Sequence, residues 1–293
     1  MRPIDRTAVI TGAGSGLGKD IAVGLAAKGY RVWGTARSEQ EVSSLTAVSE
    51  GRVALNIVDV TDEQALREFA AQVSVELDAG LNLLFGNAGI LTPGPLEVVS
   101  LDKIRHEFEV NVFGALATVN AFLPVLRKAR GRVVFTSSVT AAFPVPFNGP
   151  SSASKAALEA FADIYRTELH PFGVDVVIAQ PGNMVTGGPA KTANALVSAH
   201  AAMTPAEQAL YGEVFGRFMT MFNVAQAAGM SSELAAAKMI ALSEQVPAPT
   251  RAPIGADAES LLALVAHSSD EQLDEARRSM LADTPGSSTL AEN

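Results

Sequence analysis

Short apolar runs alternate with amphipathic segments along the chain as far as residue 180. Several runs are apolar nearly throughout, which is typical of parallel strands covered by helices on both faces. Six strands are expected, at 8–10, 32–35, 53–58, 81–85, 133–136 and 174–179. Helical patterns lie between them at 17–28, 62–78, 101–129 and 152–169. This alternation, with one early glycine loop, predicts an α/β fold built on a doubly wound parallel β-sheet.

The start of the second helical pattern carries a capping signal, and the pattern changes after Pro181. Thr61 with Gln64 indicates a capping box. Residues 187–230 are rich in Ala, Met and Phe and show no clear strand.

Helical patterns return at about 232–245 and 257–266, and the proline-rich segment between them could hold a final edge strand, where proline is tolerated. We expect a single domain over 1–283, in which 187–230 form a helical substrate lid. Residues 284–293 are expected to form a loose tail.

Composition narrows the function classes. The chain of 293 residues, 48% of them hydrophobic, can bury a full core. A net charge of −9 argues against nucleic acid as a partner. No uninterrupted apolar run approaches the roughly 20 residues that span a bilayer, and the first six residues do not have the form of a signal peptide. The sequence has no cysteine, and its four histidines show no metal-ligand spacing, so we expect a cytoplasmic protein without a metal site.

A glycine-rich loop lies between the first expected strand and the first expected helix, at 11–18 (TGAGSGLG). Glycines permit a tight turn and close approach of the backbone, while the helix N-terminus offers N–H groups to a pyrophosphate. A purely structural turn is the alternative. The spacing of Gly12, Gly16 and Gly18 resembles the TGxxxGxG motif of the short-chain dehydrogenase/reductase family, rather than the general GxGxxG.

The resemblance continues at the ends of later strands, covers roughly residues 5–190, and implies the Rossmann fold. The pair 59–60 (DV) resembles the family's adenine contact, and 181–186 (PGNMVT) resembles its PGxxxT segment. The segment 87–89 (NAG) resembles the family's NNAG motif, with Gly86 in place of the first Asn. Thr186 would reach the nicotinamide carboxamide. The cofactor-binding residues that the resemblance implies are Gly12, Ser15, Gly16, Leu17, Gly18, Arg37, Asp59, Val60, Asn87, Ala88, Gly89, Lys155, Pro181, Gly182, Met184 and Thr186.

The end of the second strand bears on the choice of cofactor. An acidic side chain there would bind the adenosine ribose hydroxyls and repel a 2′-phosphate. Neither Ala36 nor Arg37 is acidic, and Arg37 can pair with that phosphate. This favours NADP(H) over NAD(H), with a solvated arginine at the start of the next helix as the alternative.

The catalytic residues that the resemblance implies are Asn111, Ser138, Ser151 and Lys155. In the family a Ser holds the carbonyl oxygen, a Tyr exchanges the proton, a Lys binds the nicotinamide ribose, and an Asn completes a water relay. Ser138, Lys155 and Asn111 match this pattern, but Ser151 stands at the tyrosine position.

Serine cannot do the work of that tyrosine. Ser151 lies one helical turn before Lys155, so both project from the same face. Its hydroxyl is shorter and far less acidic than a phenol, whose ordinary pKa is about 10. Tyr165 lies four turns further along the helix, roughly 21 Å away. We therefore expect the chain to bind NADP(H) but to reduce ketones slowly or not at all.

Three explanations of Ser151 remain open. The family-like sequence around it, and the retention of its three partners, favour a deliberate Tyr→Ser substitution in an otherwise active enzyme. A natural nucleotide-binding protein that senses redox state, or that pairs with an active subunit, is the rival. A nucleophilic Ser151, activated by Lys155, is the third and least favoured.

Apolar side chains predict the substrate. Apolar residues after position 200 are spaced three and four apart, which indicates apolar stripes on helices. These stripes either pack into a core or form a flexible lid over the cofactor. They consist of Met203, Leu210, Tyr211, Phe215, Phe218, Met219, Met221 and Phe222. Phe143 and Phe147 would line the same mouth. No arginine cluster accompanies them, so a small apolar ketone or secondary alcohol is expected. The phrases at 35–38 and 251–258 resemble the hydroxysteroid and retinol dehydrogenase branches. The helices at 101–129 and 152–169 are long and apolar on more than one face, and in the family the corresponding helices form a dimer interface, often within a tetramer. The resemblance therefore implies a homodimer or homotetramer.

Overall fold

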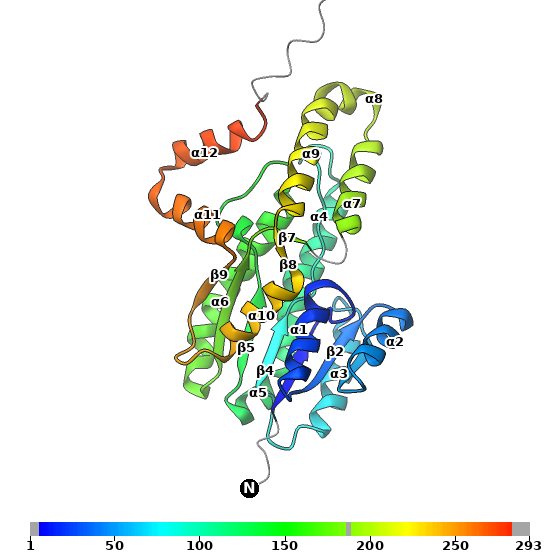
Figure 1. Cartoon of the computed structure of the whole chain (residues 1–293), viewed down its shortest axis with the longest axis vertical. Coiled ribbons are helices and arrows are strands. Elements are labelled where there is room, and N and C mark those ends of the chain that lie inside the picture. The colour runs from blue at the N-terminus through cyan, green and yellow to red at the C-terminus, as the bar shows by residue number, and fades with distance from the viewer. Residues whose placement is uncertain (1–5, 186–188, 283–293) are drawn as a thin grey trace, which may run out of the picture.

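Seven parallel strands form the main sheet of the computed structural model, which describes residues 6–185 and 189–282 (Figure 1). Their order is β3-β2-β1-β4-β5-β6-β9. The strands are β1 Thr7–Ile10, β2 Arg31–Ala36, β3 Val53–Ile57, β4 Leu83–Gly86, β5 Arg132–Thr136, β6 Asp175–Pro181 and β9 Arg251–Ile254. A small second sheet pairs β7 Met184–Val185 with β8 Met230–Ser231. The expected doubly wound sheet is confirmed, and its strand order reverses between β1 and β4.

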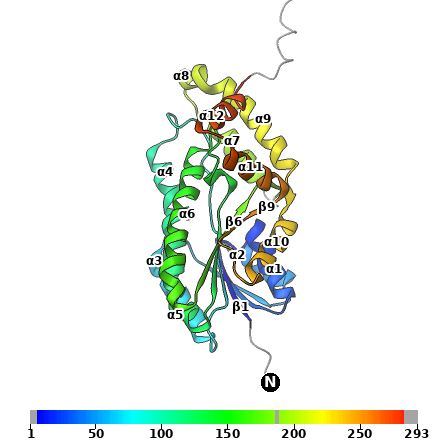
Figure 2. The ribbon, with the colours of Figure 1, turned by 90° about the vertical axis from the view of Figure 1, so that its left-hand side faces the viewer.

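Helices cover both faces of this sheet. They are α1 Gly16–Ala27, α2 Glu39–Val48, α3 Glu63–Val75, α4 Leu101–Phe108, α5 Gly114–Ala129, α6 Gly149–Leu169, α7 Pro189–Ala201, α8 Pro205–Glu207, α9 Glu213–Ala227, α10 Ser232–Glu244, α11 Ala256–His267 and α12 Asp270–Ser279. Figure 2 shows α1, α2 and α10 on one side of the sheet and α3, α5 and α6 on the other. Helices α7, α8 and α9 extend beyond one end of the sheet, and α12 also lies at that end (Figure 1).

The burial of the first strand on both faces shows why the strands of this sheet are apolar nearly throughout. All four residues of β1 are buried. Val9 packs into the core under α3, α5 and α6, whereas Ala8 and Ile10 pack into the core under α1 and α10. Because successive side chains of a strand point to opposite faces, a sheet covered on both sides needs apolar residues at every position.

Several sequence-based boundaries were wrong. The capping box at Thr61 and Gln64 does not form, because Asp62 caps α3 by accepting from the N–H of Ala65 and Thr61 is bonded to Asp59 instead. The third strand ends at Ile57, so Asp59 and Val60 lie in the turn beyond it.

Three helices also differ from the expectation. Helix α6 begins at Gly149, three residues earlier than expected, with a proline in its first turn. Helix α12 was missed altogether, and the helix expected to follow Arg37, which is α2, was given no bounds.

The segment 101–129 is one continuous helix, built from α4, a π-helical turn Glu109–Phe113 (η1) and α5. It is the one helix among the described residues long and apolar enough to cross a membrane, with a mean hydropathy of 1.4 over its most apolar window. That window is 56% buried inside the protein, and Val119, Phe122 and Leu126 are completely buried in the core. Such packing is typical of the core helix of a soluble protein, so length and composition are weak grounds for a membrane span.

Candidate active site

The carboxyl ends of β1, β4, β5 and β6 meet at one edge of the sheet, below α7 and α9 (Figure 1). The loops that leave these four strands carry Gly12, Ser15, Ser138, Gly182 and the segment 87–89. In doubly wound sheets, ligands bind in the crevice at this edge, where the strand order reverses.

The glycine loop after β1 is packed directly onto the loop after β4. Gly12 has a φ of +66°, and a Cβ there would lie 3.1 Å from the Cα of Ala88. A Cβ on Gly18 would lie 2.3 Å from the carbonyl oxygen of Gly12 and 2.5 Å from Nδ2 of Asn87. The Thr11 hydroxyl accepts from the N–H groups of Asn87 and Ala88, at 3.0 Å each. Glycine is thus required at both positions, and the two loops form one floor.

This floor fits the pyrophosphate of a dinucleotide. Helix α1 starts at Gly16, directly behind the loop, with Ser15 as its extended N-terminal flanking residue. The first N–H groups of a helix have no carbonyl partner inside it, and the helix dipole favours an anion at this end. The backbone of Gly16, Leu17 and Gly18 therefore supplies N–H donors at the end of the glycine loop.

Gly86, which departs from the NNAG motif, has a packing explanation. It is the last residue of β4, and a Cβ there would lie 3.0 Å from the ring of Phe135 on the neighbouring strand. Asn87 keeps the structural role of the loop, since its side-chain amide donates to the carbonyl of Thr11 and its Oδ1 accepts from the hydroxyl of Thr136.

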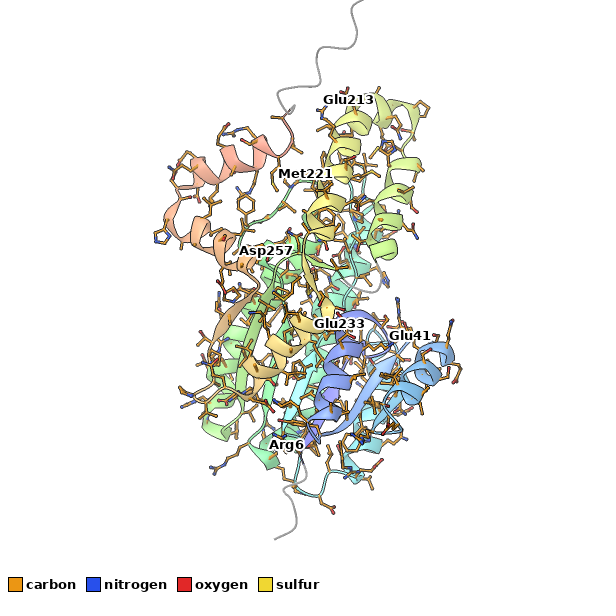
Figure 3. All side chains as sticks on the ribbon, in the orientation of Figure 1. Arg6, Glu41, Glu213, Met221, Glu233 and Asp257 are labelled. Carbon is orange, nitrogen blue, oxygen red and sulfur yellow. The ribbon has the colours of Figure 1, made fainter. Side chains whose placement is uncertain are left out.

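An acidic side chain lies toward the β2 end of this edge of the sheet, where the sequence indicated none. Glu41, in the first turn of α2, accepts at Oε2 from the N–H of Arg37, at 2.8 Å. A Cβ on Gly14 would lie 2.4 Å from the same oxygen, so the carboxylate lies against the glycine loop. Figure 3 labels Glu41. The Arg37 side chain itself is exposed. The sequence did contain a signal, because Ser38 with Glu41 has the spacing of a capping box, and Ser38 does cap α2.

Asp59 lies at the same end, in the turn after β3. Its carboxylate accepts from the N–H of Thr61 at 2.9 Å and from the Thr61 hydroxyl at 2.8 Å. The backbone hydrogen bond is the main reason why the pKa of Asp59 lies below its usual value, and the charge of Arg37 contributes in the same direction. Asp59 is therefore a fixed anion with an ordered side chain. Val60 packs against Gly114.

The candidate catalytic side chains come from the end of β5, from η1 and from α6. Ser138 follows β5, and its hydroxyl oxygen accepts from the N–H and the hydroxyl of Thr140, at 3.1 and 3.0 Å. Ser151 lies in the first turn of α6 and is 9% exposed. Lys155 follows one turn later, with its ammonium group donating to the carbonyl of Thr136 at 2.7 Å.

Asn111 reaches this cluster from the π-helical turn. Its Oδ1 accepts from the N–H of Ile90 at 2.8 Å, and its Nδ2 lies 3.0 Å from the carbonyl of Ile90 and 3.0 Å from the hydroxyl of Ser154. A Cβ on Gly89 would lie 3.2 Å from Oδ1 of Asn111 and 3.6 Å from Nζ of Lys155. The side chains of Asn111 and Lys155 thus both lie close to Gly89. A π-bulge is a frequent device for placing a side chain at a functional site.

The electrostatics of the cluster centre on Lys155. Burial lowers the pKa of Lys155 from 10.5 to about 8, although the carboxylates of Glu107 and Glu159 act in the opposite direction. Glu107, which the sequence analysis missed, is completely buried on the last turn of α4. Burial raises the pKa of its carboxyl group, against the opposing effects of its hydrogen bonds and of the Lys155 charge.

Tyr165 lies away from this cluster. Its hydroxyl donates to Asn120 at 2.8 Å, and its ring stacks on Phe135 with centroids 6.5 Å apart. Of the residues of the expected PGxxxT segment, Pro181 ends β6, Gly182 packs against Asp257 and Met184 pairs with Met230. Thr186 lies outside the described residues.

The apolar residues of the expected lid form their own cluster. Its buried members are Leu196, Met203, Phe215 and Phe218, and Phe147 packs against them. The ring of Phe147 lies 5.1 Å from that of Phe215 and 5.3 Å from that of Phe218, in edge-to-face geometry. Phe143, by contrast, is buried under α12, where the Arg277 guanidinium lies 5.0 Å from the centre of its ring. Phe147 therefore packs the segment before α6 against α9.

Known proteins resemble this chain in sequence and in fold. A family model described as short chain dehydrogenase matches residues 6–195. The 3-ketodihydrosphingosine reductase of Bacteroides thetaiotaomicron is 35% identical over 180 residues, 61% of this chain and 64% of that protein, so the chain spans less than two thirds of that relative's length. The NADPH-dependent 3-dehydrocapnine reductase of Ornithobacterium rhinotracheale is 31% identical over 241 residues, 80% of this chain and 82% of that protein.

The solved structure of a short chain dehydrogenase from Burkholderia cenocepacia, in complex with NADP, superposes with a TM-score of 0.72 at 25% identity. The superposition covers 95% of this chain and 98% of that one.

Proposed function

The chain belongs to the short-chain dehydrogenase family of oxidoreductases, and from this premise we propose that it binds NADP(H) and interconverts an apolar ketone and its secondary alcohol slowly. The slowness follows from Ser151, which stands where the family has its proton-donating tyrosine. The place of Ser151, buried in the first turn of α6 and one turn before Lys155, is the observation that carries the proposal.

Three observations support NADP(H) as the cofactor. Arg37 is exposed at the adenosine end of the crevice and can pair with a 2′-phosphate. One relative is named as NADPH-dependent, and one structural neighbour holds NADP. Glu41 acts against this preference, because its carboxylate is held beside Arg37. We propose that the 2′-phosphate pairs with Arg37 and displaces Glu41.

The bound cofactor would supply the hydride, and the protein must orient the substrate and manage the proton. The Ser138 oxygen accepts from Thr140, which leaves its own hydroxyl proton to bind a substrate carbonyl oxygen. The Lys155 ammonium is held by Thr136 next to the floor of the crevice and is the candidate for the nicotinamide ribose.

The apolar cluster beyond the strand ends supports an apolar substrate. Phe147, Phe215 and Phe218 form a packed wall there, and Tyr211 and Met221 adjoin it. A wall of this kind favours a ligand with little charge.

Exposed apolar side chains on α6 and on the π-helical turn between α4 and α5 support a homo-oligomer. Phe113, Phe161 and Ile164 are 50%, 43% and 57% exposed, and such residues are suited to a subunit interface. We propose a homodimer or homotetramer that works in the cytoplasm.

The deciding experiment compares the chain with its Ser151→Tyr variant. NADPH oxidation is followed by absorbance with a panel of apolar ketones, and NADPH binding by fluorescence. Losing a positioned acid typically costs about 10²–10⁴ in rate, so the variant should gain a factor of that order. Ser151→Phe, which adds the ring without the hydroxyl, is the matched control and should show no gain.

Each outcome decides between the two functions. NADPH binding by both proteins, with fast turnover only in Ser151→Tyr, supports a reductase impaired at its proton donor. Binding without turnover in either protein would refute that function and favour a nucleotide-binding sensor or partner subunit.

A further inference from the structure

A buried carboxylate on α6 contacts three neighbouring strands of the sheet. Glu159 is 8% exposed. Its Oε1 accepts from the hydroxyl of Ser137 at 2.6 Å and from Nε2 of Gln180 at 3.0 Å. Its Oε2 accepts from the same Nε2 at 3.2 Å and lies 3.4 Å from Nη1 of Arg251. Ser137 follows β5, Gln180 belongs to β6 and Arg251 begins β9, so one side chain of α6 connects all three.

The two strand partners of this carboxylate stand next to candidate site residues. Ser137 directly precedes Ser138, the candidate binder of the substrate oxygen. Gln180 directly precedes Pro181 and Gly182, two of the candidate cofactor-binding residues. The carboxylate thus lies behind both the substrate side and the nicotinamide side of the proposed reaction.

Successive turns of α6 hold the end of β5. Lys155 donates to the carbonyl of Thr136 at 2.7 Å, and Glu159, one turn later, accepts from the hydroxyl of Ser137. The N–H of Ser137 donates to the carbonyl of Ala179 on β6, at 2.8 Å. The backbone that leads to the candidate binder of the substrate oxygen is therefore fixed from both α6 and β6.

The ion pair with Arg251 does not explain Glu159. Nη2 of Arg251 lies 2.9 and 2.7 Å from the two carboxylate oxygens of Asp163, one turn further along α6, so Asp163 is its closer partner. A buried carboxylate costs free energy unless it is hydrogen-bonded, and an apolar side chain would fill the space without that cost. The shorter bonds of Glu159, to the ends of β5 and β6, are the ones that distinguish it from Asp163.

We propose that Glu159 is a positioning residue, which holds Ser138 and Gly182 at a fixed separation so that the substrate carbonyl and the nicotinamide meet in the geometry of hydride transfer. The inference rests on the proposed function. Glu159 touches neither ligand in this scheme and acts through Ser137 and Gln180. A misplacement of about 1 Å at reacting groups can lower a rate about 10²-fold, so loosening these strand ends should slow the reaction.

The first test uses the Ser151→Tyr background, where turnover is expected to be fast enough to resolve losses. Glu159→Gln replaces one acceptor oxygen by an amide group that faces the amide of Gln180, and kcat should fall about 10–10²-fold. Asp163→Asn is the matched control, because it changes the carboxylate that holds Arg251 and leaves the ends of β5 and β6 as they are. Its kcat should stay unchanged.

Exchanging the two side chains separates positioning from a general loss of stability. In the double variant Glu159→Gln/Gln180→Glu, one amide again faces one carboxylate, and the amide oxygen at position 159 can still accept from Ser137. The double variant should recover most of the kcat that Glu159→Gln loses, whereas Gln180→Glu alone, which places two carboxyl groups together, should lose activity.

A smaller change tests the same hydrogen bond if Glu159→Gln folds poorly. Ser137→Ala removes a single hydroxyl group and should reproduce part of the loss in kcat. Where both variants fold, the loss in the combined variant should be smaller than the product of the two single losses, because both changes remove one shared contact.

Nucleotide binding tests the role without turnover. NADPH carries both an adenosine end and a nicotinamide end, whereas adenosine 2′,5′-bisphosphate carries the adenosine end alone. Glu159→Gln should weaken NADPH binding several-fold in titration calorimetry and leave the binding of the bisphosphate unchanged. A general loss of structure would weaken both ligands.

The outcomes distinguish the positioning role from the function on which it rests. Equal kcat in Glu159→Gln and Asp163→Asn would overturn the positioning role. So would an equal weakening of NADPH and bisphosphate binding, or a double variant whose melting temperature recovers while its kcat does not. If the Ser151→Tyr chain reduces no ketone, the proposed function is overturned, and the comparison of the two nucleotides then decides whether Glu159 positions the nicotinamide end of the crevice.

Discussion

Replacing Lys155 by methionine should stabilise the folded protein at neutral pH while weakening cofactor binding. The Lys155 ammonium donates one hydrogen bond to the Thr136 carbonyl and lies among buried groups. Burial lowers the pKa of Lys155 from 10.5 to about 8. The folded state therefore disfavours the charge that this lysine carries in the unfolded chain, and methionine removes the charge while filling similar space.

The magnitude follows from the pKa difference between the two states. A shift from 10.5 to about 8 corresponds to about 3 kcal/mol against the charged form. Screening by water at this partly buried side chain reduces the figure to about 2 kcal/mol. Losing the hydrogen bond to Thr136 costs about 1 kcal/mol. The variant should therefore gain about 1 kcal/mol of unfolding free energy at pH 7.

The sign of the pH dependence follows from the lowered pKa of Lys155. Below about pH 8 the lysine is charged in both states, so folding bears the full penalty. Between about pH 8 and 10.5 the unfolded chain binds more protons than the folded one, and stability rises with pH. The advantage of Lys155→Met should thus be present at pH 7 and vanish by about pH 10.5.

Urea unfolding at pH 7 and pH 10 measures both effects, with NADPH fluorescence titrations in parallel. Lys128→Met, at an exposed position on α5, is the matched control and should show no such change between the two pH values. If Lys155→Met is less stable than the unsubstituted chain at pH 7, or if the difference in stability is the same at both pH values, the reasoning from burial is refuted.

Two other substitutions test the crevice and the lid. Glu41→Gln should strengthen NADPH binding about 3–10-fold relative to NADH, because the charge of the Glu41 carboxylate beside Arg37 opposes binding of the 2′-phosphate by about 1 kcal/mol. An equal change in affinity for both cofactors in fluorescence titrations would contradict this. Phe215→Ala deletes a completely buried ring that contacts Phe147 and should cost about 3–5 kcal/mol in the packing of the lid, seen as a lower urea midpoint. Leu210→Ala, at a residue 68% exposed, is its control, and an equal loss in both variants would show that the cluster is not a packed unit.

The strands and long helices were predictable from the sequence because each obeys one local rule. Parallel strands buried on both faces read as apolar runs, and β1, with every residue buried, is such a case. The final edge strand was also foreseeable, since Pro253 can lie in β9, which has a neighbour on one side only.

The missed elements have weaker patterns. Helix α2 buries one residue, Leu45, and α12 buries one, Leu273, so neither shows an apolar stripe. Their start signals were nevertheless present, because Ser38 and Ser269 each stand at the N-terminal cap of their helix. At the start of α3 the sequence offers two neighbouring N-cap residues, Thr61 and Asp62. Asp62 caps the helix by accepting from the N–H of Ala65, because the Thr61 hydroxyl donates to Asp59 instead.

The site was predictable as a set of motifs but not as a network. Gly12, Ser138 and Lys155 stand at positions that a sequence motif identifies. Glu107 belongs to no motif, and the capping-box spacing of Glu41 with Ser38 marks the start of a helix but not a place in the site. They enter the site because α2 folds back beside the glycine loop and because α4 lies against α6, which are facts of packing over long stretches of chain.

The contacts of Asn111 and Lys155 change what their presence says about Ser151. Asn111 holds both backbone groups of Ile90, so a chain without catalytic activity would still need it for folding. Its retention is therefore no measure of activity. Lys155 is different, because its buried charge lowers the stability of the folded chain and its single hydrogen bond to Thr136 does not offset that cost. A residue kept at a cost in stability is better explained by a ligand that needs its charge, and the nicotinamide ribose is the ligand that we propose.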